Sequence, residues 1–156
     1  MEREIITTAD GSSTIFIPQW NESYHSKHGA IQEAYHVFIK NGFSLFEGKP
    51  VSILEIGFGT GLNAFITLIE ANKLNTSVHY TGVEAFPVLE KELNHLNYCN
   101  QFEKEYWFEE MKRQGFIVTH HEHQLPNTKN HILFLYNVYK NVQLFLSFVI
   151  LNYCLC

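Results

Sequence analysis

Three glycines at alternate positions, Gly57, Gly59 and Gly61, directly follow a run of mostly apolar residues, 51–56. A continuous apolar run closed by glycines is typical of a buried parallel strand. After the turn, apolar residues recur at the spacing of one helix face, at Leu62, Phe65, Ile66, Leu68 and Ile69. The N-terminus of such a helix offers free backbone N–H groups, and a strand, turn and helix of this kind is where an open α/β sheet binds a nucleotide-like ligand.

The spacing of these glycines narrows the chemistry of the ligand. A dinucleotide-binding turn needs its third glycine at position 62, which is Leu62, and a phosphate-binding P-loop would continue with Lys-Ser or Lys-Thr, which is absent. With Glu55 two positions before the first glycine, the turn is similar to the cofactor loop of class I S-adenosylmethionine-dependent methyltransferases. Glycine there lets the backbone approach the methionine part of the cofactor closely. The alternatives are an ordinary tight turn and a fragment of an NAD-type dehydrogenase, which Leu62 disfavours.

Glu84 is the second candidate for ligand contact. It follows the next predicted strand, 78–83, which is rich in β-branched and aromatic residues. A carboxylate at the tip of a second strand can accept hydrogen bonds from both hydroxyls of a ribose, whereas the alternative is a solvated loop carboxylate. Together with the glycine turn, Glu84 predicts a nucleoside-binding site.

The remaining pattern predicts the elements around this site. Residues 1–12 are predicted to be a polar lead-in, 13–17 a short strand ended by Pro18, and 19–30 a loop. A helix is predicted over 31–39, because apolar residues recur on one face and Asn41-Gly42 follows. Beyond the second strand, helices are predicted over 88–98 and 101–114, and a third strand over 116–119.

The composition favours one domain with a hydrophobic core. The chain has 156 residues, of which 46% are hydrophobic and 17% charged. With a net charge of −5, the chain lacks the overall positive charge that would favour an extensive RNA-binding surface, but a small RNA-binding surface is not excluded. The three cysteines form no even disulfide framework, and the N-terminus lacks the apolar core of a signal peptide, so a cytoplasmic location is expected.

Residues 120–156 differ in character from the rest of the chain. They contain three charged side chains and a histidine cluster, His120, His121, His123 and His131. No acidic or cysteine partner stands at a recognised spacing, so solvated histidines are favoured over a metal site, and we expect no metal. The apolar run 144–150 predicts a buried strand or an aggregation-prone segment and is too short to be a membrane anchor, which needs about 20 residues.

Three blocks in order, 19–39, 54–65 and 80–87, resemble the MnmC-type methyltransferase family. In bacteria such proteins occur alone, as MnmD, or fused to a flavin-dependent oxidase. The family performs the last methylation at the wobble uridine of certain tRNAs, turning the 5-aminomethyl group into a methylaminomethyl group. The resemblance covers roughly residues 15 to 118.

This resemblance implies a Rossmann-like class I methyltransferase sheet with S-adenosylmethionine as cofactor and tRNA as partner. It also implies a functional partnership with a flavin-dependent oxidase and no membrane association. Tyr24 and Glu33, in the N-terminal block, should lie near the methyl donor or the target amine, with packing of an N-terminal helix as the alternative. The cofactor site should be lined by Glu55, Gly57, Gly59, Gly61, Asn63 and Glu84.

The C-terminal segment departs from the family pattern. The family's catalytic landmark, a strand ending in Asp-Ala-Phe followed by proline, is absent, and further sheet elements are missing. We therefore expect residues 1–119 to be the N-terminal part of a methyltransferase domain, incomplete at its C-terminus, and 120–156 to be a divergent tail foreign to the fold. No catalytic residue is assigned. Two hypotheses follow: a tRNA-modifying methyltransferase, truncated and inactive as it stands, or a non-catalytic module that binds S-adenosylmethionine or needs a partner chain.

Overall fold

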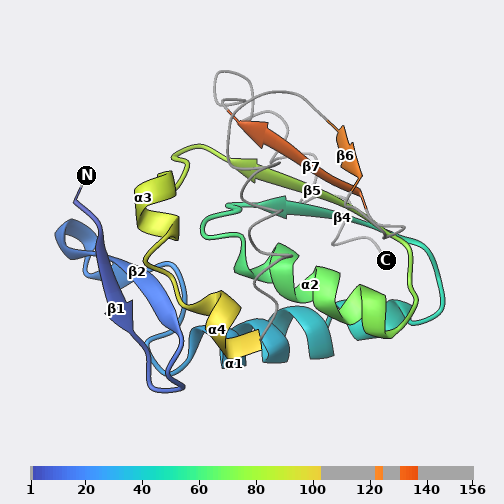
Figure 1. The fold of residues 1–156 in the computed structure, drawn as a ribbon, viewed down its shortest axis with the longest axis horizontal. Helices are drawn as coiled ribbons and strands as arrows, with labels where there is room; N and C mark the ends of the chain where they lie inside the picture. The colour runs from blue at the N-terminus through green and yellow to red at the C-terminus, as the bar shows by residue number, and fades with distance from the viewer. Residues whose placement is uncertain (1, 103–121, 125–130, 137–156) are drawn as a thin grey trace, which may run out of the picture.

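The computed structural model describes residues 2–102, 122–124 and 131–136, and contains two sheets (Figure 1). A small antiparallel sheet has the order β1-β2-β3, formed by Glu4–Thr7, Ser13–Ile17 and Glu22–Ser23. The larger sheet has the order β4-β5-β7-β6, formed by Val51–Ile56, Val78–Glu84, His131–Tyr136 and Glu122–Gln124. Strands β4, β5 and β7 are parallel and β6 is antiparallel, so the chain has the mixed α/β architecture that the sequence predicts.

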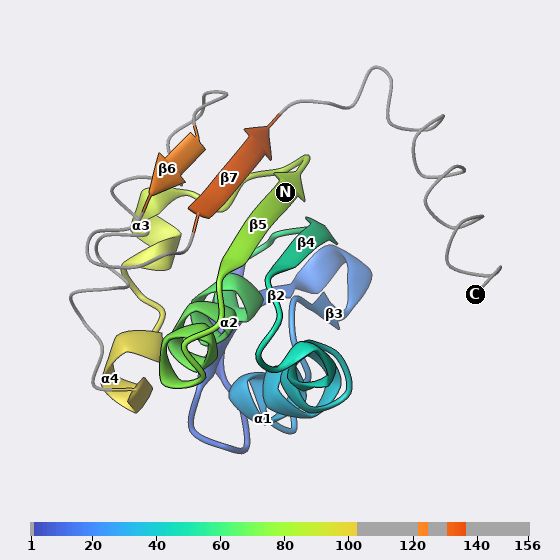
Figure 2. The same ribbon diagram turned by 90° about the vertical axis from the view of Figure 1, so that its right-hand side faces the viewer.

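Helices α1 and α2 lie on the same side of the larger sheet (Figures 1 and 2). Helix α2 (Leu62–Lys73) buries its apolar face against β5, where Phe65 and Ile66 are fully covered together with Tyr80. Helix α1 (Ala30–Ala34) continues into the π-helical segment η2 (Tyr35–Lys40), which brings Phe38 to within 6.2 Å of the Tyr80 ring. The 3-10 turns are η1 (Pro18–Trp20) and η3 (Phe43–Phe46).

The elements around the glycine turn are confirmed, namely the strands over 51–56 and 78–83 and the helix that begins at Leu62. The strand over 13–17 and the helical stretch over 31–39 are also present. The polar lead-in predicted over 1–12 contains a strand that the sequence analysis did not predict. Residues Glu4–Thr7 form β1 because they pair antiparallel with β2, with Ile5 opposite Ile15, and such a partner cannot be read from the local pattern.

The prediction that the strand over 51–56 is parallel is confirmed, but the prediction that it is buried is wrong for one of its faces. Leu54 and Ile56 are each 46% exposed, whereas Glu55 between them is buried. Among the described residues, β4 is an edge strand, and α1 and α2 cover only one face of it (Figure 2). One apolar face of β4 is therefore left open in this part of the chain.

Within the helix predicted over 88–98, only α3 (Glu90–Leu93) forms before the next helix, α4 (Tyr98–Phe102), begins. Asn97 lies between them, and its side chain accepts a hydrogen bond from the Ser13 N–H at 2.8 Å and donates one to the Gly11 carbonyl at 2.8 Å. Asparagine has a low helix propensity, and these two bonds hold Asn97 in the non-helical segment between α3 and α4. The chain is thereby turned toward the β1–β2 loop.

Several predictions fall on residues outside the described part: the helix over 101–114 beyond Phe102, the strand over 116–119 and the apolar run 144–150. Of the histidine cluster, His123 in β6 and His131 in β7 are described as backbone only, and His120 and His121 lie outside the described residues. Strand β7 pairs in parallel with β5, with Tyr136 opposite Glu84. The division of the chain at residue 119 stays a prediction. None of the described helices combines the length and the apolar character needed to cross a membrane.

Candidate functional site

The glycine turn joins the carboxyl end of β4 to the start of α2. Gly57, Gly59 and Gly61 all have positive φ, at 84°, 56° and 75°. The N–H groups of Gly57 and Phe58 both donate to the carbonyl of Val83, at 2.8 and 3.1 Å, which ties the turn to the end of β5. Two features of Gly59 disfavour any side chain at this position. Its φ is positive, and a Cβ would lie 2.9 Å from Cδ1 of Tyr24.

Glu84, at the end of β5, lies beside this turn. One of its carboxylate oxygens accepts a hydrogen bond from the Gly59 N–H at 2.8 Å, and the other accepts one from the Phe86 N–H at 2.8 Å. The two parts of the predicted site, far apart in sequence, therefore meet at the carboxyl edge of the parallel strands. Their role as cofactor ligands stays a prediction.

Glu55, in β4 two residues before the turn, is a buried acid. It accepts hydrogen bonds from Asn63 Nδ2 and from the Tyr80 hydroxyl, each at 2.8 Å. Burial raises the pKa of Glu55 to about 7; the two hydrogen bonds lower it, and the Glu84 carboxylate raises it further. The carboxyl group can therefore gain or lose a proton near neutral pH.

A cavity of about 220 Å³ lies between the glycine turn and helix α1. Six of the eight predicted site residues line it: Tyr24, Glu33, Glu55, Gly57, Gly59 and Asn63. Gly61 and Glu84 are not part of its lining. The remaining walls come from His25, Ala34, Val37, Phe38 and Phe58. Tyr24 and Glu33 thus border the same space as the turn, and their place near a methyl donor or a target amine stays a prediction.

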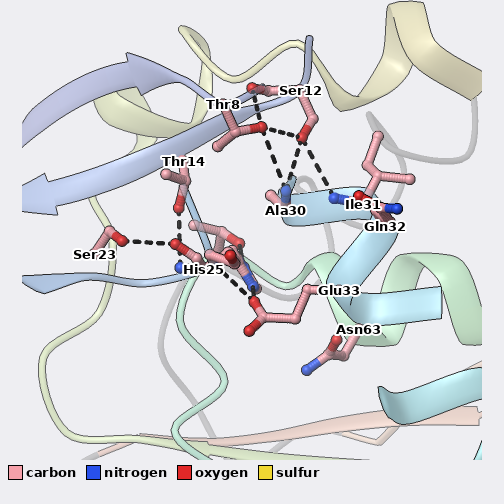
Figure 3. A network of polar contacts seen from close by, with 12 residues as sticks. Thr8, Ser12, Thr14, Ser23, His25, Ala30, Ile31, Gln32, Glu33 and Asn63 are labelled. Atoms are coloured by element: carbon pink, nitrogen blue, oxygen red, sulfur yellow. Dashed lines mark hydrogen bonds and ion pairs between the residues drawn. The ribbon is translucent and has the colours of Figure 1, made fainter. Parts of the chain in front are cut away.

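Helix α1, which carries Glu33, is fixed at its first turn by the β1–β2 loop (Figure 3). Ser12 Oγ accepts hydrogen bonds from the Ala30 and Ile31 N–H groups at 3.1 and 3.3 Å, and Asp10 accepts one from the Gln32 N–H at 2.9 Å. These bonds satisfy backbone donors that a helix cannot satisfy itself. Burial raises the pKa of Asp10, but hydrogen bonds from Ser12, Gln32 and Thr8 outweigh it and bring the pKa to about 2.

Two residues missed by the sequence analysis also shape the site. His25 lines the cavity, and its Nε2 lies 2.9 Å from the Thr60 hydroxyl of the glycine turn. Arg3 of the supposed lead-in donates to the Phe86 and Pro87 carbonyls, at 2.6 and 3.1 Å, and to Glu92 at 3.0 Å. Neither belongs to a recognisable spacing; the only available signal was the place of His25 next to Tyr24.

No protein-family model matches the sequence. The tRNA 5-methylaminomethyl-2-thiouridine biosynthesis bifunctional protein MnmC of Leptospira borgpetersenii is 36% identical over 85 residues, covering 49% of this chain and 13% of that protein. The MnmC protein of Polaromonas naphthalenivorans is 32% identical over 115 residues, which cover 64% of this chain and 18% of that protein. The crystal structure of MNMC2 from Aquifex aeolicus superposes with a TM-score of 0.66 at 25% identity, over 91% of this chain and 45% of that one.

This chain is similar in sequence to several MnmC proteins and similar in structure to MNMC2. The matches to several of these proteins, at 31% to 37% identity, fall on its N-terminal part, where the glycine turn and the cavity lie. The chain spans less than a fifth of the two curated MnmC relatives quoted above and less than half of the solved MNMC2 chain. The relatives' names place those proteins in the modification of tRNA.

Proposed function

We propose that this chain is the N-terminal part of an S-adenosylmethionine-dependent methyltransferase, built on a Rossmann-like class I sheet, that methylates the aminomethyl group of the wobble uridine in tRNA. The observation that supports this most is the cavity at the carboxyl edge of β4 and β5, where the glycine turn meets acidic side chains. The MnmC relatives supply the substrate class. A cytoplasmic location and cooperation with a flavin-dependent oxidase belong to the same proposal.

The described residues fit one end of the cofactor. The cavity is lined by Glu33 and Glu55 and by no lysine or arginine among the described residues, which suits a ligand carrying sulfonium and ammonium charges. Its volume, about 220 Å³, is below the range of roughly 300–1,000 Å³ typical of sites for whole ligands of that size. Glu84, on the other side of Gly59, would accept hydrogen bonds from the ribose hydroxyls in addition to those from the Gly59 and Phe86 N–H groups.

When bound, S-adenosylmethionine supplies an electrophilic methyl group. To use it, the site would have to hold the substrate amine in its neutral form and in line with the methyl group. In this chain Glu55 and the glycine turn would hold the cofactor, and Tyr24 and Glu33 would border the space that the amine enters. No described residue is assigned as the base that takes the amine's proton.

One observation favours a second function, a non-catalytic module completed by a partner. The face of β4 that carries Leu54 and Ile56 is open in the described part of the chain, and so is the edge of that strand. Exposed apolar surface on an unpaired edge strand is typical of a site that another chain covers. Such a module would bind the cofactor without methylating tRNA.

Calorimetric titration with S-adenosylhomocysteine tests the proposal. We expect saturable binding that Gly59→Asp abolishes and that Gly48→Asp leaves unchanged. Gly48 is a matched control, because it also has positive φ, at 74°, but lies away from the cavity with open space around it. Absence of binding by the wild-type chain would refute the proposal. Transfer of a labelled methyl group to tRNA that carries 5-aminomethyluridine would then separate the enzyme from the binding module.

A further inference from the structure

His25 joins three parts of the molecule that meet at the cavity (Figure 3). Its backbone is held by the N-terminal sheet, because its N–H donates to Thr14 Oγ1 at 3.1 Å and its carbonyl accepts from Ser23 Oγ at 2.6 Å. Its imidazole extends to the glycine turn through the 2.9 Å contact between Nε2 and Thr60 Oγ1. On its other side, Nδ1 lies 3.9 Å from the Glu33 carboxylate on α1.

The hydrogen bonds of Thr60 determine which imidazole nitrogen carries the proton. The Tyr98 hydroxyl donates to Thr60 Oγ1 at 3.1 Å, and both residues are fully buried. If His25 Nε2 also donated to this oxygen, Thr60 Oγ1 would receive two donors, and its own buried proton would lose the imidazole as acceptor, which is costly. The favourable arrangement has Thr60 donating to a bare Nε2, with the hydrogen of a neutral imidazole on Nδ1, facing Glu33.

We propose that His25 is a positioning residue for the cofactor-binding turn. As a neutral imidazole with its hydrogen on Nδ1, it fixes Thr60 and, through it, the backbone N–H groups between Gly59 and Gly61. This inference rests on the proposed function of the cavity. It adds a residue that acts on the turn from outside the turn's own sequence and couples it to the N-terminal sheet.

Protonation of His25 would remove this support. Nε2 would become a donor, and the Thr60 hydroxyl would lose its acceptor. Burial lowers the pKa of His25 below its usual range, and Glu33 opposes this shift, so the imidazole is neutral at neutral pH. The other titratable groups around it are Tyr98 of α4, behind Thr60, and Tyr24 and Glu55 on the cavity wall.

The tautomer can be measured in the free protein. Two-dimensional ¹H–¹⁵N correlation of histidine side chains, with the His25 signals assigned by their loss in His25→Gln, should show a bare Nε2 and a protonated Nδ1. In Thr60→Val the hydroxyl donor is gone, and we expect the two tautomers to become mixed. A protonated Nε2 in the neutral wild-type imidazole would overturn the proposal, whatever the chain binds.

Affinity for S-adenosylhomocysteine tests the role itself. His25→Phe should weaken binding about tenfold, because it leaves the buried Thr60 hydroxyl without an acceptor. His25→Gln keeps an amide oxygen near the position of Nε2 and should restore most of the affinity. The wild-type affinity should also fall in acid, with a midpoint below pH ~6.5, and the His25→Gln affinity should lack this step.

The outcomes separate this inference from the proposed function. A wild-type chain that does not bind the ligand would overturn the function and the role of His25 together. A wild-type chain that binds, alongside a folded His25→Phe variant that binds equally well, would overturn the role of His25 alone. The role of His25 would also be overturned if His25→Gln bound the ligand as weakly as His25→Phe while both variants had the circular dichroism spectrum of the wild type.

Discussion

Replacing Glu55 by glutamine is expected to stabilise the fold at pH 8 and to change its stability much less at pH 5. The residue Glu55 is only 9% exposed, and burial raises the pKa of its carboxyl group to about 7 from an ordinary value of 4.5. The folded state therefore holds this proton more tightly than the unfolded state. Stability contributed by the protonated acid is complete below pH 4.5, falls as the pH rises toward 7, and changes little above that.

The size of the effect follows from the shift. One pKa unit corresponds to about 1.4 kcal/mol, so the wild-type chain should lose roughly 2 to 3 kcal/mol between pH 5 and pH 8 through Glu55. Glutamine resembles the protonated acid in shape and can still accept the hydrogen bond from Asn63 Nδ2. The variant should therefore lack this loss and exceed the wild type in stability at pH 8 by a similar amount.

Urea unfolding followed by far-ultraviolet circular dichroism at pH 5, 6, 7 and 8 measures this difference. Comparing variant with wild type at each pH cancels the contributions of other titrating groups. Glu47→Gln, at an exposed acid away from the cavity, is the matched control and should follow the wild type. If the difference between Glu55→Gln and wild type does not grow with pH, Glu55 does not titrate as a buried acid and the reasoning is refuted.

Three further variants test how the site is held in place. Asp10→Asn should lower the free energy of unfolding by about 1 kcal/mol at pH 7, because it weakens the cap of α1. Hydrogen bonds hold the pKa of Asp10 at about 2, so this difference should persist above pH 3.8 and fade as the pH falls toward 2. Urea titrations at pH 7 and pH 2 would show it. Gly59→Ala should lower the melting temperature more than Gly48→Ala does. Both positions have positive φ, but only the first substitution would press a methyl group against Tyr24. Equal decreases in melting temperature would contradict this packing. Arg3→Gln should speed hydrogen exchange of the amides over 84–89 roughly tenfold, because it releases the Phe86 and Pro87 carbonyls. Unchanged exchange would show that the hydrogen bonds of Arg3 do not hold that loop.

The sequence predicted the part of the site that local patterns encode. The strand over 51–56, the alternate glycines and the helix from Leu62 are consecutive, and each is marked by its own periodicity or turn residues. Glu84 could be placed beside the turn because parallel strands align their carboxyl ends. The structure places these groups within hydrogen-bonding distance, with the Gly59 N–H 2.8 Å from the Glu84 carboxylate.

The features that the sequence did not reveal depend on contacts between distant segments. Strand β1 exists because it pairs with β2, and Arg3 acts on carbonyls more than 80 positions along the chain. The role of His25 depends on Thr60, and that of Thr60 on Tyr98, three residues from three different elements. The exposure of Leu54 depends on which elements cover β4. A nearly continuous apolar run favours a strand covered on both faces, so the local pattern pointed away from this open face.

Chemical-shift mapping with S-adenosylhomocysteine tests the central claim most directly, because it shows both whether the ligand binds and where. In ¹H–¹⁵N correlation spectra of the uniformly labelled chain, we expect saturable shifts at the amides of Gly57, Gly59, Gly61 and Glu84, and no shift at Gly48. Spectra that stay unchanged at millimolar ligand, or shifts confined to the open face of β4, would contradict the account.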